Sequence, residues 1–452
     1  MSKLLRLICC LALAALAACE RIEPPQADDR LVVAIRETPA FFQREGNTAS
    51  GFEHDLVTAF ADSLGLKVRF IDAADLYELN DLALGGRVHL AASMPIGHSQ
   101  LHYSAPIRTV RQWIVGHDDI LGPQQLSDLA GRTVEVLARS PLTDILRGLD
   151  EKSRPHVIEV PGVNEMELLA RVASHKAQLA AVHEIHLDLA VNFYPELSPR
   201  VQLPGKMDFG WAFNGQNAEA LRAKADAFIA AARADGTLAR IHDRYFGHIK
   251  RINAAGIARF LDDTRTKLPN WRRHFQAAQD VSGIDWRLLA ALSYQESRWD
   301  PLATSYTNVR GMMMLTEDTA DYLRVKNRLD PKESINAGAR YLAELADQIP
   351  GARHPDRLWL ALSAYNLGMG HFRGARAIAK GMKRNPDVWY EMKQVLPRLA
   401  RPEVYARLKS GPARGGEAVI MVENIRSYYD ILSRFEPAYT SPFPTQPAFA
   451  TR

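Results

Sequence analysis

Short apolar runs alternate with amphipathic stretches over the first half of the chain. Residues 31–35 have the pattern of a buried strand, residues 52–64 that of an amphipathic helix, and residues 67–71 that of a second strand. Three further apolar runs follow, at residues 88–92, 133–137 and 179–182. This alternation predicts an α/β domain with a parallel sheet.

The pattern changes in the second half, where apolar positions recur at helical spacing. Gly, Pro and polar breaks separate these stretches, and the sequence there lacks β-rich runs. Residues 285–297 are apolar on most faces and follow a helix cap in Ser282 or Asp285, which predicts a buried helix. The chain is therefore predicted to be multidomain, with an α/β domain followed by a mainly α domain.

The first residues have the pattern of a secretion signal. A short basic region precedes an apolar run at residues 7–18 that is too short to span a bilayer. The stretch Leu-Ala-Ala-Cys that ends at Cys19 is similar to the bacterial lipobox, so removal of residues 1–18 would leave Cys19 as a lipidated N-terminus. Glu20 in place of an Asp favours the periplasmic face of the outer membrane, through the lipid or by peripheral attachment. Cleavage without lipidation, which leaves a free cysteine, is the alternative.

Length and composition indicate more than one domain, because 452 residues exceed what one hydrophobic core usually organises. The net charge is only +4, and so small an excess of Lys and Arg is typical of side chains on a solvated surface. We therefore expect no nucleic-acid partner. Cys9 and Cys10 lie in the signal, so the mature chain has no disulfide. The predicted parts are a signal at 1–18, a tether at 19–30, an α/β domain at 31–249, a linker at 250–270, an all-α domain at 271–436 and a tail at 437–452.

Short motifs mark the predicted α/β domain. They are G-F-E-H-D-L at 51–56, Y-S-A-P at 103–106, L-S-D-L-A-G at 126–131, and D-G-T-L at 235–238 with Y-F-G at 245–247. In this order they resemble the extracellular solute-binding proteins of the amino-acid-binding type. That resemblance implies two α/β lobes joined by a hinge near residues 113–122 and Leu203, with a ligand cleft between the lobes.

Two departures from that family concern the ligand. Its transport members hold a carboxylate with an arginine shortly before the Y-S-A-P motif, and residues 95–100 contain none. His183 and Glu184 stand near the place of the acidic residue that holds an α-amino group. Two interpretations stay open, a retuned sensor for a muropeptide ligand and a scaffold without a ligand. The i, i+3 pair His183 and His186 is more simply a polar helix face, so we expect no metal and no cofactor.

Glu296 lies near the end of the predicted buried helix. Leu289, Leu292 and Ser293 share its face, so the carboxyl group is expected to lose hydration. Lost hydration raises the pKa of a carboxyl group, as a general acid at neutral pH requires. A glutamate that reaches water or Arg298 is the alternative, and the helix by itself favours it.

Four motifs in this region favour the interpretation of Glu296 as a general acid. E-S stands at 296–297, G-M-M-M-L-T at 311–316, A-Y-N-L-G at 364–368, and E-N-I at 423–425. Their order and spacing over residues 271–436 resemble the lytic transglycosylases with a goose-lysozyme-like fold. The resemblance implies that Glu296 is the catalytic acid and base. It also implies substrate-binding positions at Ser305, Met313, Met314, Tyr365, Asn366 and Tyr428.

Several of these side chains have a simpler interpretation as well. A run of methionines is more often core filling than a sugar platform. Asn366 more simply braces its loop, and Tyr365 is either a direct neighbour of Glu296 or a core ring with a wet hydroxyl. The aromatic residues Trp299, Tyr306 and Tyr341 fit a sugar groove or the core equally well.

The resemblance further implies a reaction on the glycan strands of peptidoglycan. Ordinary glycoside hydrolases need a second carboxylate, and no second acidic residue is expected in that role here. Glu296 would protonate the oxygen between N-acetylmuramic acid and N-acetylglucosamine, and the C6 hydroxyl would then close on C1 to give a 1,6-anhydro sugar. The alternatives are a true hydrolase and a muropeptide-binding receptor with an inactive lysozyme-like domain.

Overall fold

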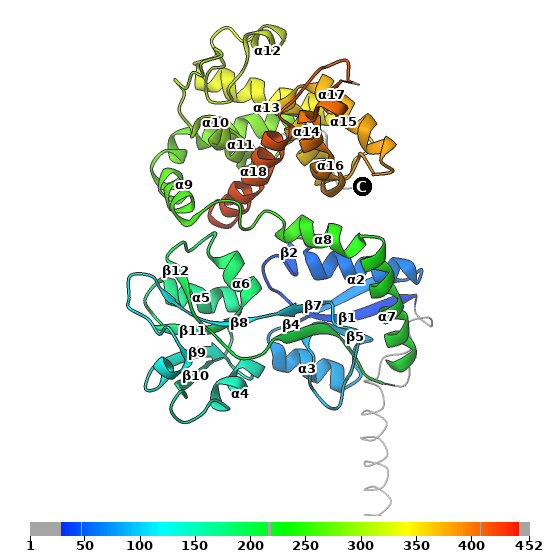
Figure 1. Cartoon of the computed structure of the whole chain (residues 1–452), viewed down its shortest axis with the longest axis vertical. Coiled ribbons are helices and arrows are strands. Elements are labelled where there is room, and N and C mark those ends of the chain that lie inside the picture. The colour runs from blue at the N-terminus through cyan, green and yellow to red at the C-terminus, as the bar shows by residue number, and fades with distance from the viewer. Residues whose placement is uncertain (1–28, 47, 216–217, 407, 443–452) are drawn as a thin grey trace, which may run out of the picture. The chain divides into compact units, whose positions relative to one another are not determined.

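The computed structural model describes residues 29–46, 48–215, 218–406 and 408–442. The chain divides into two units, Met1–Phe246 and Gly247–Arg452 (Figure 1). The first is α/β and the second is helical, so the predicted fold class is confirmed. The predicted signal, Cys19, residues 20–28 of the tether and residues 443–452 of the tail lie outside the described residues. In the described part, no helix combines the length and the apolar character needed to cross a bilayer.

Two sheets, one in each lobe, form the frame of the α/β unit. The strand order is β4-β1-β5-β13-β6 in the first sheet, where β7 also pairs with β13, and β10-β9-β11-β8-β12 in the second. A separate hairpin pairs β2 with β3. The strands are β1 (Arg30–Arg36), β2 (Gln43–Glu45), β3 (Thr48–Ser50), β4 (Lys67–Ala73), β5 (Leu90–Pro95), β6 (His102–Tyr103), β7 (Arg108–Val110), β8 (Gln112–His117), β9 (Thr133–Leu137), β10 (His156–Val160), β11 (Leu179–His183), β12 (Leu197–Gln202) and β13 (Met207–Phe213).

The chain crosses between the lobes twice. β1 is parallel to β4 and β5, and β9 is parallel to β10 and β11, as the sequence predicts. β8 and β13 run antiparallel to their neighbours because each enters its sheet from the other lobe. The second crossing, after β12, agrees with the predicted hinge at Leu203. The first lies at Arg111, before the predicted 113–122, because residues 112–117 already pair in the second sheet.

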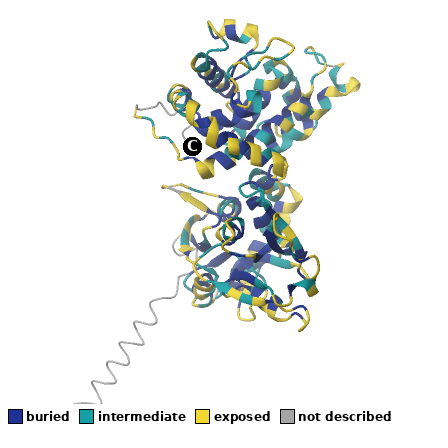
Figure 2. Ribbon diagram, turned by 90° about the vertical axis from the view of Figure 1, so that its left-hand side faces the viewer, coloured by how far each residue is buried: buried dark blue, intermediate teal, exposed yellow. Residues whose placement is uncertain are grey.

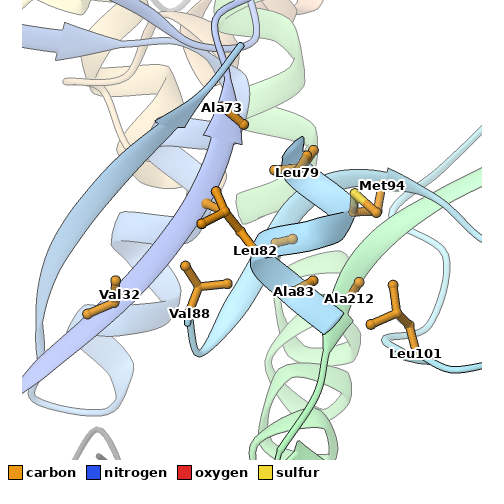
Figure 3. Packing of buried hydrophobic residues seen from close by; sticks show 11 residues of the cluster. Val32, Ala73, Leu79, Leu82, Ala83, Val88, Met94, Leu101 and Ala212 are labelled. Atoms are coloured by element: carbon orange, nitrogen blue, oxygen red, sulfur yellow. The ribbon is translucent and has the colours of Figure 1, made fainter. Parts of the chain in front are cut away.

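Helices pack on the two sheets and close a core in each lobe. In the first lobe, Leu79 and Leu82 of α3 pack with Val32 of β1 and Met94 of β5 (Figure 3). Each fully buried leucine of this kind stabilises the fold by about 2 kcal/mol. The helices are α2 (Phe52–Ser63), α3 (Leu76–Leu84), the short 3-10 helix η3 (Leu126–Leu129), α4 (Pro141–Arg147), α5 (Glu165–Ala173), α6 (Glu184–Ala190), α7 (Ala218–Ala234) and α8 (Thr237–Phe246).

Helix α11 (Trp286–Ser297) forms the middle of the helical unit, with α10, α13 and α18 packed against it. Every residue from Trp286 to Tyr294 is buried, and Figure 2 shows buried residues through the interior of the unit. The other helices are α9 (Ala254–Thr266), α10 (Leu268–Ser282), α12 (Glu317–Tyr322), α13 (Pro331–Asp347), α14 (Asp356–Leu367), α15 (Met369–Gly381), α16 (Trp389–Val395), η4 (Leu396–Ala400), α17 (Pro402–Tyr405) and α18 (Gly415–Phe435).

The predicted linker at 250–270 is instead helix α9 and the start of α10. The ring of Phe260 in α9 is fully buried, with its centroid 4.5 Å from that of Tyr294 and 4.4 Å from that of Tyr428. The linker prediction was wrong because only Ile257 and Phe260 mark the buried face of α9 as apolar, and the buried positions that follow them are polar.

Candidate active site and the cleft of the α/β unit

Glu296 lies in the last turn of α11. Of the two predicted caps, Asp285 is the one that starts this helix, where it accepts a hydrogen bond from the Arg287 amide at 2.8 Å. Leu289, Leu292 and Ser293 are fully buried, and Glu296 itself is partly buried. Burial raises the pKa of the Glu296 carboxyl to about 8. No charged or hydrogen-bonding partner opposes this among the described residues, so the group is protonated at neutral pH.

The chain turns sharply after Glu296. Arg298 and Trp299 both adopt the left-handed conformation, with φ of 54° and 57°. Such a conformation costs of order 1 kcal/mol or more per residue, so neighbouring contacts must hold it. The Trp299 indole supplies them: it is 2% exposed and donates to the Ala290 carbonyl at 2.9 Å. Trp299 is therefore a core residue and does not line a sugar groove.

Three sequence motifs meet at the backbone of Met312 and Met313. The hydroxyls of Ser293 and Ser297 on α11 both donate to the Met312 carbonyl at 2.9 Å. The Tyr365 hydroxyl on α14 donates to the Met313 carbonyl at 2.8 Å. These bonds bring the E-S, G-M-M-M-L-T and A-Y-N-L-G motifs together around the end of α11.

Gly311 starts the methionine loop and cannot be replaced without moving it. Its φ is +83°, and a Cβ atom there would lie 1.8 Å from the Arg328 carbonyl oxygen. The Arg328 guanidinium in turn donates to the carbonyls of Asn308 and Leu315 at 2.7 and 3.1 Å. The loop is therefore held rigidly on both sides of the motif.

Met313 is fully buried and packs against α13, where a Cβ on Gly338 would lie 2.7 Å from the Met313 Cε atom. Its side chain cannot reach a substrate, so the prediction of a substrate contact was wrong and the core-filling interpretation applies. Its carbonyl oxygen holds Tyr365 instead. Met314 is partly buried, with φ of 45°.

Tyr365 lies within electrostatic range of Glu296. Burial, and then the charge of Glu296, raise the pKa of Tyr365 well above its ordinary value, so its phenol stays protonated. Its ring centroid lies 5.5 Å from that of Tyr341. Tyr365 is thus fixed to the methionine loop by its hydroxyl and lies close enough to Glu296 for the charge of that carboxyl group to affect it.

The remaining predicted positions lie on the loop and helices nearby. Ser305 is partly buried, and its hydroxyl accepts from the Val309 amide at 3.1 Å and contacts Thr307 at 3.0 Å. Tyr306 is 95% exposed. Asn366 is also exposed and its amide has no bonding partner in the described part of the chain, so it does not brace the loop as expected.

Helix α18 contributes residues whose roles the sequence did not resolve. Tyr428 is partly buried against Phe260. The Asn424 amide donates to Gln295 at 3.2 Å and ties α18 to the turn that holds Glu296. Glu423 is 3% exposed and accepts from the Trp389 indole at 2.7 Å and from Arg426 at 3.0 Å. Burial would raise the pKa of Glu423, but Arg426, Lys393 and the Trp389 hydrogen bond, with a smaller part from His248, together outweigh it and lower the pKa, so this carboxylate is structural.

A cavity of about 60 Å³ lies between the two lobes of the α/β unit. The sequence offered no arginine before the Y-S-A-P motif, but Arg108, just after it, lines this cavity. Its guanidinium pairs with Glu53 at 2.7 Å and stacks over the rings of Phe41 and Phe209 at 4.5 and 4.7 Å. The sequence interpretation missed Arg108 because it considered only the residues before the motif. An arginine at the start of the strand that follows the motif is the signal that could have identified it.

Glu165 meets a guanidinium across the same cavity. The Arg36 Nη2 atom of the first lobe lies 2.8 Å from the Glu165 Oε2 atom of the second. Burial would raise the pKa of Glu165, but Arg36, His186 and His183 together outweigh it and hold the pKa well below its ordinary value. His183 and His186, expected on a polar helix face, are only 4% and 6% exposed and line the cavity, so that interpretation was wrong. Burial lowers the pKa of His186 to about 4.

Comparisons with known proteins agree with the division of the chain into an α/β unit and a helical unit. Residues 273–388 match the family described as Transglycosylase SLT domain, and residues 31–248 match Bacterial extracellular solute-binding proteins, family 3. The chain is 39% identical to the membrane-bound lytic murein transglycosylase F of Nitrosospira multiformis, over 95% of this chain and 92% of that protein. It is 41% identical to the protein of that name from Thiobacillus denitrificans, over 94% and 92%. Among solved structures, the substrate-binding protein AbpA of Streptococcus pneumoniae is 18% identical, over 50% of this chain and 98% of that chain, with a TM-score of 0.45.

Proposed function

Because the chain belongs to the membrane-bound lytic murein transglycosylase F family and is a peptidoglycan lytic transglycosylase, we propose that Glu296 is its single catalytic carboxyl group. The bond cleaved is the one between N-acetylmuramic acid and N-acetylglucosamine, and the product carries a 1,6-anhydro end. The observation that carries this proposal is the Glu296 carboxyl, whose pKa burial raises to about 8 without an opposing charge among the described residues.

In the first step, Glu296 gives its proton to the bridging oxygen as the bond from that oxygen to C1 of N-acetylmuramic acid breaks. The N-acetylglucosamine side leaves as an alcohol. The acetamido oxygen of the same N-acetylmuramic acid stabilises the positive charge at C1, as in substrate-assisted glycosidases. Glu296 is left as a carboxylate, and its poor hydration makes it a strong base.

In the second step, the Glu296 carboxylate takes the proton of the C6 hydroxyl. The C6 oxygen forms a bond to C1 as the acetamido oxygen leaves it, and Glu296 is protonated again for the next cycle. No water is consumed. A second carboxylate is not needed, and Glu423, the other acid in the matched motifs, is already occupied by Arg426 and Trp389.

The neighbours of Glu296 have supporting roles in this proposal. Tyr365 positions the carboxyl group or the departing oxygen, since its phenol stays protonated and is fixed to the Met313 carbonyl. Ser305, Met314, Asn366 and Tyr428 contact the sugars; each of them is at least partly accessible.

The test is the product spectrum of purified chain acting on peptidoglycan sacculi, read by mass spectrometry. We expect anhydro-muropeptides from the unchanged chain. Glu296→Gln keeps the shape of the side chain but has no proton to give, so release should fall by about a thousandfold. Glu403→Gln is the matched control, because Glu403 is exposed on α17 in the same unit.

Each competing interpretation predicts a different spectrum. A hydrolase would leave reducing ends that are heavier by one water. A receptor with an inactive catalytic unit would release nothing. Near-normal release by Glu296→Gln would refute the assignment of Glu296.

For the α/β unit we propose a regulatory role in which the cleft binds a muropeptide. A cavity of about 60 Å³ has room for about four waters, which is enough for one end of a peptide stem. Arg108 supports an acidic ligand, because its Nε atom is buried and has no hydrogen-bond partner among the residues that the structure describes. Titration calorimetry with muropeptides should give heat with the unchanged chain and less with Arg108→Met. Absence of heat from the unchanged chain would favour a scaffold role.

We also propose that Cys19 carries a lipid that holds the chain at the periplasmic face of the outer membrane. The support is the lipobox-like sequence that ends at Cys19. Metabolic labelling with a radioactive fatty acid should mark the unchanged chain and not Cys19→Ala. Equal labelling of both chains, or none of either, would exclude lipidation at this residue.

A further inference from the structure

Three side chains of the second lobe direct ligand-type atoms at one point. The Nδ1 atoms of His183 and His186 lie 3.7 and 3.9 Å from the Oε1 atom of Glu165, and the three atoms lie within 4.8 Å of one another. These distances are too long for hydrogen bonds. Both Nδ1 atoms are buried without a hydrogen-bond partner in the described structure. Two buried, unpaired nitrogens facing one carboxylate oxygen need an explanation.

The contacts around the imidazoles leave those nitrogens available. The Nε2 atom of His183 lies 3.4 Å from the Met207 sulfur, a weak acceptor, which favours the proton on Nε2 and the lone pair on Nδ1. The His186 ring is fixed against Phe41, with centroids 5.4 Å apart. The His183 lone pair is then on Nδ1, and the His186 Nδ1 atom lies 3.9 Å from the same carboxylate oxygen.

We propose that Glu165, His183 and His186 form a binding site for a divalent transition-metal ion, with zinc as the best match. Two imidazole nitrogens and one carboxylate oxygen are the donors of three-ligand zinc sites that keep a fourth position open. Ligand atoms at about 2.05 Å from zinc in a tetrahedron lie about 3.4 Å apart. The observed 3.7 and 3.9 Å require these two nitrogen–oxygen pairs to contract by a few tenths of an ångström, and the two nitrogens, which lie within 4.8 Å of each other, also move closer when the ion binds. All three residues line the cavity, so the open position faces it.

The charges in the cleft are compatible with a bound cation. Arg36 occupies the other carboxylate oxygen, Oε2, at 2.8 Å, which leaves Oε1 for the ion and orients the carboxylate. The second arginine of the cleft, Arg108, is paired with Glu53 at 2.7 Å. The site does not depend on the catalytic proposal, because all its residues belong to the α/β unit.

A second histidine cluster in the same unit serves as a comparison. His117, Asp119 and His175 also lie close together, but His175 and Asp119 are exposed. The Nδ1 atom of His117 is already paired with Asp119 at 2.5 Å. A metal that bound histidines without selectivity would use this exposed cluster as readily as the buried one.

The experiment titrates the full chain, purified in detergent and freed of metal with a chelator, with zinc against a chromophoric competitor. We expect one tight equivalent. His186→Gln and His183→Gln should each weaken binding by at least tenfold, and His175→Gln should leave it unchanged. Zinc should also raise the melting temperature of the unchanged chain and of His175→Gln, but not that of His186→Gln.

Cobalt provides a measurement that needs no variant. One equivalent should give the intense visible absorption of a four-coordinate ion with nitrogen ligands. Absence of both this absorption and stoichiometric zinc binding in the unchanged chain would overturn the proposal, whether or not the variants fold. Loss of binding in His175→Gln with full binding in His186→Gln would overturn it as well.

Discussion

Glu296 and Glu165 are both withdrawn from water, and their surroundings give them opposite protonation states. Glu296 ends an apolar helix with no charged neighbour in the described structure, and burial raises its pKa to about 8. Glu165 is buried too, but Arg36 at 2.8 Å, together with His186 and His183, holds its pKa well below the ordinary value. Burial alone therefore does not decide the charge of a carboxyl group; the presence or absence of a partner does.

The two states suit two different tasks. A neutral carboxyl group can give a proton to a departing oxygen, as the proposed role of Glu296 requires. A charged carboxylate can hold a guanidinium of the opposite lobe, which the cleft of the α/β unit needs. The comparison predicts that changes to the two residues will have opposite effects on stability.

The largest effect on stability is expected from Glu165→Gln. The amide cannot pair with the Arg36 charge, so the free energy of unfolding of the α/β unit should fall by about 3 kcal/mol at pH 7 in metal-free buffer. Because the folded-state pKa is lowered, the contribution of Glu165 is present above its unfolded pKa and is lost as the pH falls through the folded value. Hydrogen exchange of β1 and β11 amides measures it. Glu151→Gln, an exposed change in the same unit, is the control.

The pH dependence of activity tests the raised pKa of Glu296. If Glu296 is the general acid, it must be protonated in the free enzyme, so kcat/KM should be constant up to a pH of about 8, the pKa of Glu296, and then fall tenfold per pH unit. The rate of anhydro-muropeptide release across pH measures this. A decline that already begins near pH 5 would mean that the carboxyl has an ordinary pKa and that the comparison with Glu165 is mistaken.

Glu296→Gln should stabilise the helical unit, in contrast to Glu165→Gln. The folded-state pKa of Glu296 is raised, so the unchanged chain loses stability as the pH rises from about 4.5 to about 8, whereas the amide does not titrate. The variant should exceed the unchanged chain by on the order of 2 kcal/mol at pH 6, by more at higher pH, and match it near pH 4. Hydrogen exchange of the α11 amides measures the free energy of unfolding of the two chains at these pH values. A pH-independent difference would contradict the raised pKa.

The smallest effect is expected from Tyr365→Phe, which removes the hydroxyl bonded to the Met313 carbonyl. If Tyr365 positions Glu296, kcat should fall by about tenfold with little change in KM, and the alkaline limb of the pH profile should move. A purely structural tyrosine would change stability by about 1 kcal/mol and leave the pH profile in place. Tyr390→Phe, at another partly buried tyrosine of the unit, is the control.

Local patterns carried much of the fold prediction. The strand predicted at 133–137 is β9, and the helix predicted at 52–64 is α2 with its end shifted by one residue. The surroundings of Glu296 could also be predicted from the sequence, because helix geometry alone places Leu289, Leu292 and Ser293 on the same face as Glu296. Helix α9 was missed because polar residues share its buried face and packing on Tyr294 and Tyr428 holds it.

The sequence by itself determined the two kinds of domain, the buried helix and the position of its carboxyl group, since each depends on neighbours within a few residues. The tertiary structure alone decided that Met313 fills the core, that Arg108 enters the cleft, and that His183 and His186 face Glu165. Those contacts join elements of different sheets and helices. Side-chain periodicity reports which face of an element is buried, but it carries no information about which distant residue lies opposite.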